Sequence, residues 1–403
     1  MTSNRGSISG VDQPLTVAAA IVLITTAYVF YNVQPAFISA VDQSLSLSDA
    51  QLGFLFASYS LGLAFAAISA VFWIRRIDWR RWTYAATLFT IATYFLLMAA
   101  DYTVLLALLL VLGFASGINV SIALTCLGDS TNPARGFGLG LAGQLSLAGL
   151  LLYLIPSEVT PAWGLNGCLV VLAAVTAVAL PFLRFIPRRG SEQREPGSQL
   201  PTESAGVGSY RIACFALVGM VLYTFGQSAL WAFLELMGSD KGYDNKTVGA
   251  VLGVGLTLSA SGSLLSAALG TRYGRIIPIS VAALSFLIAM GMWWIFDGVV
   301  AFAVATFLYY FAWNFSLPYQ YILVTASDPS GRLTPLLCAT QMLGSVFGPA
   351  AAGLLIVGND YRGVYVMAGI AVAASTLVFV LTEGMLRRSQ QRVTQSAAPG
   401  GAF

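Results

Sequence analysis

Apolar stretches long enough to cross a bilayer alternate with short polar connections along nearly the whole chain. A membrane helix needs about 20 mostly apolar residues to cross roughly 30 Å of hydrocarbon. Twelve stretches meet this requirement. They lie near residues 15–40, 50–73, 82–100, 104–127, 136–155, 163–185, 211–236, 247–269, 276–296, 299–324, 333–357 and 363–386. The pattern predicts an all-α integral membrane protein with twelve transmembrane helices in a lipid bilayer. It lacks the ten-residue alternating segments that are typical of a transmembrane β-barrel.

Composition supports this prediction and excludes several functions. Hydrophobic residues make up 57% of the 403 residues, charged residues make up 9%, and the mean hydropathy is +0.79. The chain contains no histidine, so a histidine-based catalytic triad or metal site is impossible. It also lacks the G-x-x-x-x-G-K-[ST] loop that binds nucleotide phosphates. We therefore expect no enzymatic activity, no cofactor and no bound metal.

The basic residues indicate how the helices are oriented. If both termini are cytoplasmic, all of the 20 lysines and arginines lie on the cytoplasmic side except Lys241, Lys246 and Arg362. Cytoplasmic loops of membrane proteins carry such an excess. The net charge of +3 thus reflects topology and does not indicate a nucleic-acid partner. We expect a multi-pass protein of the cell (plasma or inner) membrane with both termini in the cytoplasm.

A long polar stretch between Arg184 and Tyr210 divides the chain into two sets of six spans. Its content of Pro, Gly, Ser and Glu is that of a flexible linker. The predicted organisation is a cytoplasmic tail at 1–14, a six-helix bundle at 15–185, a cytoplasmic linker at 186–209, a second six-helix bundle at 210–386 and a cytoplasmic tail at 387–403.

Three landmarks recur in both halves with nearly the same spacing. A glycine early in the second span returns 196 positions later, and an arginine after the fourth span returns 197 positions later. A glutamine stands nine residues beyond each of these arginines. The matching pairs are Gly53 and Gly249, Arg135 and Arg332, and Gln144 and Gln341. Such agreement indicates an internal duplication, and parallel six-span repeats are a transporter architecture.

The loop between the eighth and ninth spans reads G-T-R-Y-G-R from Gly270 onwards. It resembles the G-x-x-x-D-R-x-G-R signature of the major facilitator superfamily, with Thr271 in place of the aspartate, and Arg75–Arg81 is a degenerate version of it. The glycines around Pro349 are also similar to the helix pattern of that family. The arginine that its proton-driven drug exporters carry in the fourth span is absent from 108–117. The resemblance implies two pseudo-symmetric six-helix bundles that rock about a central site, and we expect a monomer.

Amides, hydroxyls and aromatic rings inside several spans are candidates for lining the solute cavity. Such groups are costly when they face lipid, so they should face water or one another. At a rise of about 1.5 Å per residue, the repeated glutamines lie near the middle of the membrane. The predicted cavity residues are Tyr31, Gln34, Tyr59, Asn119, Gln144, Gln227, Trp231, Asn314, Tyr319, Gln320 and Gln341. The alternative for each is an interhelical hydrogen bond of modest strength, but for the repeated glutamines we favour the cavity.

Glu235 is the one carboxylate that we place within a span, and two interpretations of it remain open. It follows Gln227 and Trp231 at a spacing of four residues, so the three side chains share one helix face. A carboxylate within the membrane is a candidate proton carrier. Glu235 also lies about 36 Å along the helix from Arg211, which is the depth of the outer interface, where an acidic residue is ordinary. It is therefore a candidate for ion coupling or for an extracellular gate.

Charged residues in the cytoplasmic loops are candidates for an inner gate. The resemblance implies ion pairs that hold the cytoplasmic face shut when the cavity opens outward, whereas membrane topology alone is the alternative explanation for the arginines. The predicted gate residues are Arg76, Asp78, Asp129, Arg135, Arg272, Gly274, Arg275, Asp328 and Arg332.

These features predict a secondary active transporter that moves a small organic solute by alternating access and is coupled to an ion or proton gradient. A neutral or weakly amphipathic solute fits a cavity without a charge in the middle of the membrane. Two alternatives remain: a solute sensor that retains the transporter fold, and a multidrug or metabolite exporter of the same superfamily. A membrane-embedded enzyme is disfavoured because no pair of nucleophile and base is evident.

Overall fold

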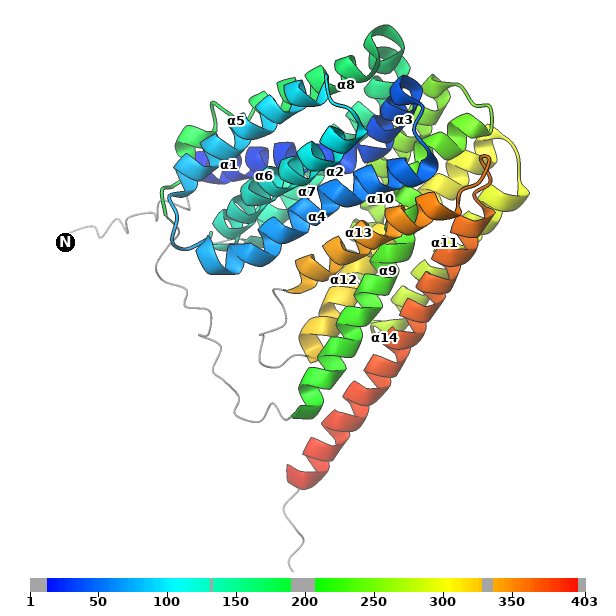
Figure 1. The fold of residues 1–403 in the computed structure, drawn as a ribbon. Coiled ribbons are helices and arrows are strands. Elements are labelled where there is room, and N and C mark those ends of the chain that lie inside the picture. The colour runs from blue at the N-terminus through cyan, green and yellow to red at the C-terminus, as the bar shows by residue number, and fades with distance from the viewer. Residues whose placement is uncertain (1–12, 131–132, 190–206, 328–335, 398–403) are drawn as a thin grey trace, which may run out of the picture.

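The computed structural model describes residues 13–130, 133–189, 207–327 and 336–397, and most of these residues are helical. The β-structure within these ranges is one isolated bridge between Val357 and Asp360. Figure 1 shows the helices gathered into two bundles, the first coloured blue to green and the second green to red. The predicted all-α class and the two-bundle architecture are confirmed.

The first bundle is formed by the first half of the chain. It holds α1 (Pro14–Ala27), α2 (Val29–Asn32), α3 (Gln34–Leu45), α4 (Asp49–Trp73), α5 (Trp79–Leu97), α6 (Tyr102–Gly128), α7 (Pro133–Leu154), the π-helix η1 (Ile155–Val159), α8 (Thr160–Ala177) and the 3-10 turn η2 (Leu183–Phe185).

The second bundle is formed by the second half of the chain. It holds α9 (Val207–Asp240), α10 (Asn245–Leu269), α11 (Ile276–Ile295), α12 (Val299–Ser327), α13 (Leu336–Leu355) and α14 (Arg362–Ala397). Each predicted span coincides with one helix or with a run of consecutive helices. One stretch that is long and apolar enough to span a membrane, Arg135–Ala177, contains both α7 and α8. α14 continues to Ala397, through most of the predicted C-terminal tail.

The first span is broken into α1, α2 and α3 at Tyr28 and Val33. Pro35 has no N–H to donate, and its ring crowds the preceding turn, so the helix bends at this point. Val33 departs from helical geometry, with φ −113° and ψ 14°. The bend places Tyr31 and Gln34 on either side of an interruption in the backbone. Transporters commonly place their binding sites at such discontinuous helices.

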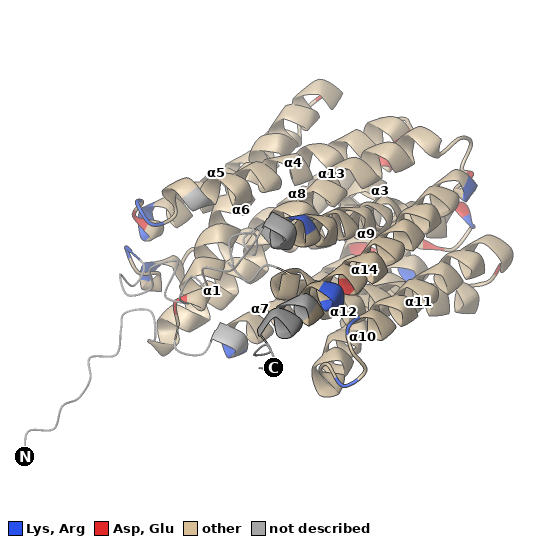
Figure 2. Ribbon diagram, turned by 90° about the horizontal axis from the view of Figure 1, so that it is seen from below, with Lys and Arg blue, Asp and Glu red and all other residues tan. Residues whose placement is uncertain are grey.

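Charged residues lie mainly at helix ends and in loops, as Figure 2 shows. We call the end of the molecule that carries Arg75, Arg135, Arg272 and Arg387 the arginine-rich end. In Figure 1 the bundles lie side by side at the opposite end and diverge toward the arginine-rich end.

At the opposite end the bundles approach so closely that backbone meets backbone. A Cβ atom placed on Gly53 of α4 would lie 2.4 Å from the carbonyl oxygen of Pro349 in α13. One placed on Gly253 of α10 would lie 2.3 Å from the carbonyl oxygen of Gly149 in α7. Glycine alone permits this approach without a shift of the backbone. We call this end the glycine-sealed end.

The glycine contacts at this end recur with the spacing of the internal repeat. Gly249 is the counterpart of Gly53, and a Cβ placed on it would lie 3.1 Å from the carbonyl oxygen of Tyr153 in α7. Tyr153 stands 196 positions before Pro349, the partner of Gly53. The same contact therefore occurs twice, once between α4 and α13 and once between α10 and α7. This pseudo-symmetry agrees with the duplication that the sequence indicated.

Packing between the bundles ends part-way along the helices. On α10, Gly249 and Gly253 are buried, but the same stripe continues to Leu264 and Ala268, which are exposed. Leu264 is 71% exposed. On α7, a Cβ placed on Gly138 would meet nothing within 4 Å. The bundles are thus closed at the glycine-sealed end and separate toward the arginine-rich end.

Candidate functional site

A layer of buried polar side chains lies at the seam between the bundles. Gln34 of α3 is 1% exposed, and neither atom of its amide has a hydrogen-bond partner among the described residues. α3 packs against α9, where Oε1 of Gln227, Nε1 of Trp231 and Oε2 of Glu235 are equally buried and unpartnered. Each unsatisfied polar group of this kind costs about 1–3 kcal/mol. The layer therefore suits a site that accepts water or a polar solute.

Tyr31 joins the two bundles next to this layer. Its hydroxyl lies 3.1 Å from Oγ of Ser345 in α13, a contact between the first bundle and the second. Oγ of Ser345 lies 3.1 Å from the Gln341 carbonyl oxygen, to which it donates. Gln341 is therefore one helical turn from the seam contact, on the same face of α13, and it is half-buried.

Gln144 holds the corresponding place in the first bundle. It is half-buried and lies one turn before the buried Ala148 on the same face of α7. Gly149, the next residue, meets α10 across the seam. Both repeated glutamines thus lie where the packed part of the seam gives way to the part that separates. This is the level at which we expected the solute cavity.

Asn119 and Asn314 are buried and hydrogen-bond within their own bundles. Nδ2 of Asn119 donates to Oγ1 of Thr87 in α5 at 3.1 Å. Nδ2 of Asn314 donates to Oγ of Ser259 in α10 at 2.9 Å. Each bond joins two helices of one bundle, which favours the interhelical interpretation for this pair.

Three further predicted cavity residues, Tyr59, Tyr319 and Gln320, are also buried. The Tyr319 hydroxyl donates to the Ser266 carbonyl at 3.4 Å, and Nε2 of Gln320 donates to a serine hydroxyl one turn earlier in α12. The Tyr59 ring packs on Phe30 with centroids 4.5 Å apart. These contacts hold the three side chains inside their bundles, while the Tyr59 hydroxyl and Oε1 of Gln320 are buried without a hydrogen-bond partner among the described residues.

Glu235 is buried between helices of both bundles. It is 3% exposed, it interacts with the Ser39 side chain of α3, and α3 of the first bundle packs against α9. Its Oε2 atom lacks a hydrogen-bond partner in the described part of the chain. The carboxyl group thus lies inside the protein, at a height where the sequence alone suggested an exposed interface.

Glu383 corrects one prediction. We expected Glu235 to be the one carboxylate within a span, but Glu383 lies in the predicted span 363–386 and is 6% exposed. The sequence did contain a signal for it. Arg387 follows four residues later, which is the spacing of a helical ion pair.

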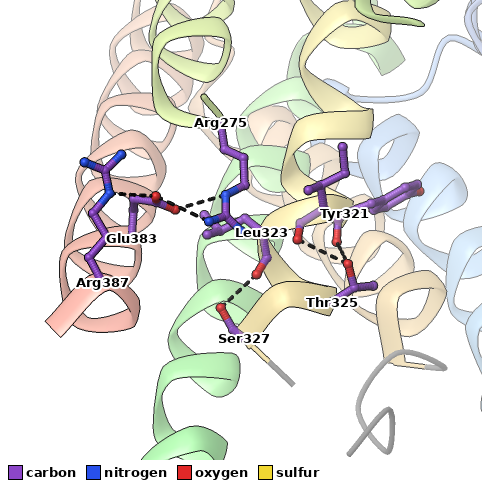
Figure 3. Close-up of polar contacts among 8 residues, drawn as sticks. Arg275, Tyr321, Leu323, Thr325, Ser327, Glu383 and Arg387 are labelled. Atoms are coloured by element: carbon purple, nitrogen blue, oxygen red, sulfur yellow. Dashed lines mark hydrogen bonds and ion pairs between the residues drawn. The ribbon is translucent and has the colours of Figure 1, made fainter. Parts of the chain in front are cut away.

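Glu383 binds two arginines at the arginine-rich end (Figure 3). Nε of Arg275 lies 3.1 Å from Oε2 of Glu383, and Nε of Arg387 donates to Oε1 at 2.9 Å. Arg275 stands immediately before α11. The cluster therefore fixes the beginning of α11 against α14 within the second bundle.

In the first bundle, Asp129 pairs with Arg75 and not with Arg76, which we predicted as the gate arginine. Nη2 of Arg75 donates to Oδ1 of Asp129 at 2.8 Å, and Nη1 donates to Oδ2. These hydrogen bonds raise the pKa of the Arg75 guanidinium above its ordinary value. The pair ties the end of α4 to the end of α6, while Arg76 is exposed.

Three other predicted gate residues, Asp78, Arg272 and Gly274, have local structural roles in the loops before α5 and α11. Asp78 caps α5 by accepting the backbone N–H of Arg81 at 3.1 Å, and the two side chains form an ion pair at 3.6 Å. The Arg272 guanidinium lies 5.9 Å from the centroid of the Tyr273 ring. Gly274 has φ +72°, a left-handed conformation that favours glycine.

Each ion pair within the described residues joins groups of a single bundle. Arg135 is exposed, and Asp328 and Arg332 lie outside the described residues. An inner gate would need ion pairs between the bundles in the opposite conformation. It therefore stays a prediction.

Replacing Glu383 with alanine should destabilise the second bundle. It would leave the Arg275 side chain, which is 19% exposed, without its acidic partner. Breaking a fully buried pair costs about 3–5 kcal/mol, and because water reaches this site we expect about 2 kcal/mol, seen as a lower melting temperature in detergent. Arg81→Ala, which removes an exposed pair, is the control and should cost less than about 1 kcal/mol. Equal shifts in the two variants would contradict a structural role for the cluster.

Comparison with known proteins agrees with this architecture. The model of the Major Facilitator Superfamily matches residues 19–334. Among solved structures, a D-xylose-proton symporter has a TM-score of 0.72 at 13% identity and covers 91% of this chain and 96% of its own. The nucleoside transporter NupG has a TM-score of 0.68 at 14% identity, with coverages of 93% and 99%.

A bacterial homolog of the human lysosomal transporter Spinster, in an inward-facing and unoccupied conformation, has a TM-score of 0.66 at 16% identity and covers 97% of this chain and 100% of its own. A search of curated proteins by sequence finds no match. At these identities the solved structures show the fold alone, whereas the family model covers most of the chain. The chain therefore belongs to the Major Facilitator Superfamily and is a multi-pass membrane transporter, not an enzyme.

Proposed function

We propose that the protein is a secondary active transporter that moves a small organic solute by alternating access. One observation carries this proposal: the seam is sealed by glycines at one end, and Gln144 and Gln341 lie where the bundles begin to separate. A solute entering from the arginine-rich end would pass these glutamines and stop at the Tyr31–Ser345 contact. Rocking of the bundles about the buried polar layer would then expose the solute to the other side.

The arginine excess supports a cytoplasmic position for the arginine-rich end, with both termini on that side of the cell membrane. The conformation described here is then the inward-facing one. We propose a monomer as the functional unit, because the two bundles of one chain supply both walls of the seam.

The chemistry of the polar layer favours an uncharged or weakly amphipathic solute. Its unpartnered groups are amides, an indole N–H and one carboxyl, and the Trp231 ring packs against Tyr310 with centroids 5.5 Å apart. Amides and aromatic rings orient a neutral polar molecule, whereas a strongly ionic one would require a charged partner. Two of the similar solved proteins are a nucleoside transporter and a D-xylose-proton symporter. Nucleosides and pentoses are therefore the first solutes to test.

Glu235 is the group that we propose to couple transport to a proton gradient. An unpaired carboxylate is costly to bury, so the neutral, protonated form suits the sealed arrangement. When the glycine-sealed end opens, water would reach the carboxyl group, which would then exchange its proton with that side of the membrane. A side chain that alternates between these two environments carries one proton in each cycle.

A thermal-shift screen of uncharged solutes tests the binding site. A solute that binds only the folded protein raises its melting temperature. We expect at least one hit, and Gln144→Ala or Gln341→Ala should weaken its binding about tenfold, the equivalent of one lost hydrogen bond of about 1.4 kcal/mol. Gln391→Ala, an exposed glutamine on α14, is the matched control. Unchanged affinity in both glutamine variants would contradict the proposed site.

Transport of the hit in proteoliposomes then separates the possible functions. Solute counterflow that requires both glutamines would support the carrier. Binding without any flux would favour a solute sensor that retains the fold. Net movement out of the cytoplasm would identify a metabolite or multidrug exporter within the superfamily.

A further inference from the structure

A cavity of about 170 Å³ lies in the second bundle at the glycine-sealed end. It is bounded by the ends of α9 and α11 and by the loop and first turn of α14, with Asp240, Trp293 and Tyr365 among its walls. Pockets for drug-sized ligands have volumes of about 300–1,000 Å³, so this cavity suits a smaller molecule. All its lining residues belong to the second bundle, and Gln227, Trp231 and Glu235 of the polar layer are not among them.

Aromatic rings form one wall of the cavity. Trp293 and Tyr365 stack with centroids 6.4 Å apart and an interplanar angle of 25°, and Trp294 packs on Tyr365 at 6.3 Å. The Arg362 guanidinium lies 6.0 Å from the centroid of the Trp294 ring. Faces of such rings attract cationic groups, quaternary ammonium groups above all.

One hydrogen-bond donor in this wall lacks an acceptor. Trp293 is 1% exposed, and its Nε1 atom has no hydrogen-bond partner among the residues described. Buried tryptophan N–H groups usually find a partner, because an unsatisfied donor costs about 1–3 kcal/mol. Trp293 is among the residues that line the cavity, so an acceptor oxygen of a ligand there is the candidate partner for this N–H.

Charges of both signs line the cavity in equal number. They are Asp240, Asp360, Lys241 and Arg362. Asp240 is held in place by the Tyr361 hydroxyl, which donates to its Oδ2 atom at 2.5 Å. Asp360 and Arg362 form only a loose pair, with 3.9 Å between Oδ1 and Nε, and both side chains are more than half exposed. Charged groups of both signs are thus available to a ligand.

We propose that this cavity binds a small zwitterion, a molecule with a quaternary or simple ammonium group and a carboxylate. The carboxylate would accept hydrogen bonds from Nε1 of Trp293 and from Arg362. The ammonium group would lie against the aromatic wall and near Asp240. A ligand with one charge alone would engage lining groups of one sign only. None of the residues proposed to meet the transported solute lines this cavity.

Calorimetric titration of the purified full-length protein with glycine betaine tests the proposal. Two analogues of nearly the same shape are the comparison: 3,3-dimethylbutyrate, which lacks the positive charge, and choline, which lacks the carboxylate. We expect saturable binding of one glycine betaine per protein and at least about tenfold weaker binding of either analogue, since each loses an interaction worth about 1.4 kcal/mol. No saturable binding of glycine betaine, or equal binding of an analogue, would overturn the proposal.

Substitutions of cavity residues test whether the ligand binds in this cavity. Trp293→Phe keeps an aromatic ring and removes the N–H donor, and Asp240→Asn removes one negative charge. Each should weaken glycine betaine binding about tenfold. Trp163→Phe, a 69% exposed tryptophan on α8, should leave it unchanged. Binding that persists in both cavity variants, or that is lost in Gln341→Ala, would overturn a site in this cavity.

Discussion

Alanine at Gly53 or Gly253 should leave the protein folded and yet slow transport about thirtyfold. Each added methyl group would lie less than 2.5 Å from a backbone carbonyl oxygen of the other bundle, so the glycine-sealed end could not close without a shift. Overpacking of this kind costs about 1–3 kcal/mol, and about 2 kcal/mol corresponds to a thirtyfold change in population. Alanine is also the better helix former by about 1 kcal/mol. The melting temperature should therefore hold or rise while transport falls.

Distance measurements distinguish a protein that is trapped in one conformation from a protein that has lost transport because it is misfolded. With all four native cysteines replaced, spin labels at positions 81 and 273 report on the arginine-rich end of each bundle. In Gly53→Ala or Gly253→Ala the labels should move closer, because a molecule that cannot seal one end must close the other. Gly291→Ala is the control, since a Cβ there meets nothing within 4 Å. Unchanged label distances with normal transport would show that the glycine contacts do not form a gate.

Glu235→Gln should uncouple transport from the proton gradient. The amide has nearly the same shape as the neutral carboxyl group but cannot release a proton when the glycine-sealed end opens. We expect solute counterflow, which needs no gradient, to remain within about threefold of the unmodified protein. Accumulation driven by a pH gradient should be lost, which is the largest functional change that any single substitution proposed here should cause.

The matched control is Glu158→Gln, an exposed glutamate of η1, for which we expect gradient-driven accumulation to persist. A measurement of proton movement alongside solute flux completes the test, because the stoichiometry should fall from one proton per solute to none. If Glu235→Gln still accumulates solute with the same pH dependence, Glu235 is not the coupling group. Its burial would then serve only the packing between α3 and α9.

The helices were predictable because each must satisfy its own backbone in lipid, so a span is a local property of about 20 residues. The break at Val33 was less visible, although Pro35 was its cause and stands in the sequence. Another break was predicted between the spans 136–155 and 163–185, but the structure is helical through it, since the π-helix η1 connects α7 to α8 across Ser157 and Glu158.

Side-chain partners were not predictable to the same degree. The repeat correctly related Gly53 to Gly249, but it could not choose between Arg75 and Arg76 as the partner of Asp129. Adjacent helical positions point about 100° apart, so the choice depends on how α4 ends. Likewise, the sequence predicted that Asn119 and Asn314 line the cavity from their depth in the membrane alone. The neighbouring helix determines that each has a partner inside its bundle.

The all-α membrane class, the twelve spans, the duplication and the superfamily could be predicted without coordinates, because hydrophobic length and repeat spacing can be read directly along the chain. The folded arrangement was needed to show which end is sealed, that Glu235 is buried at the seam, and that Glu383 holds Arg275. These features depend on atoms far apart in sequence, and a difference of one residue in register would change each of them. Packing between helices, within a bundle and across the seam, supplies that information, and no local pattern does.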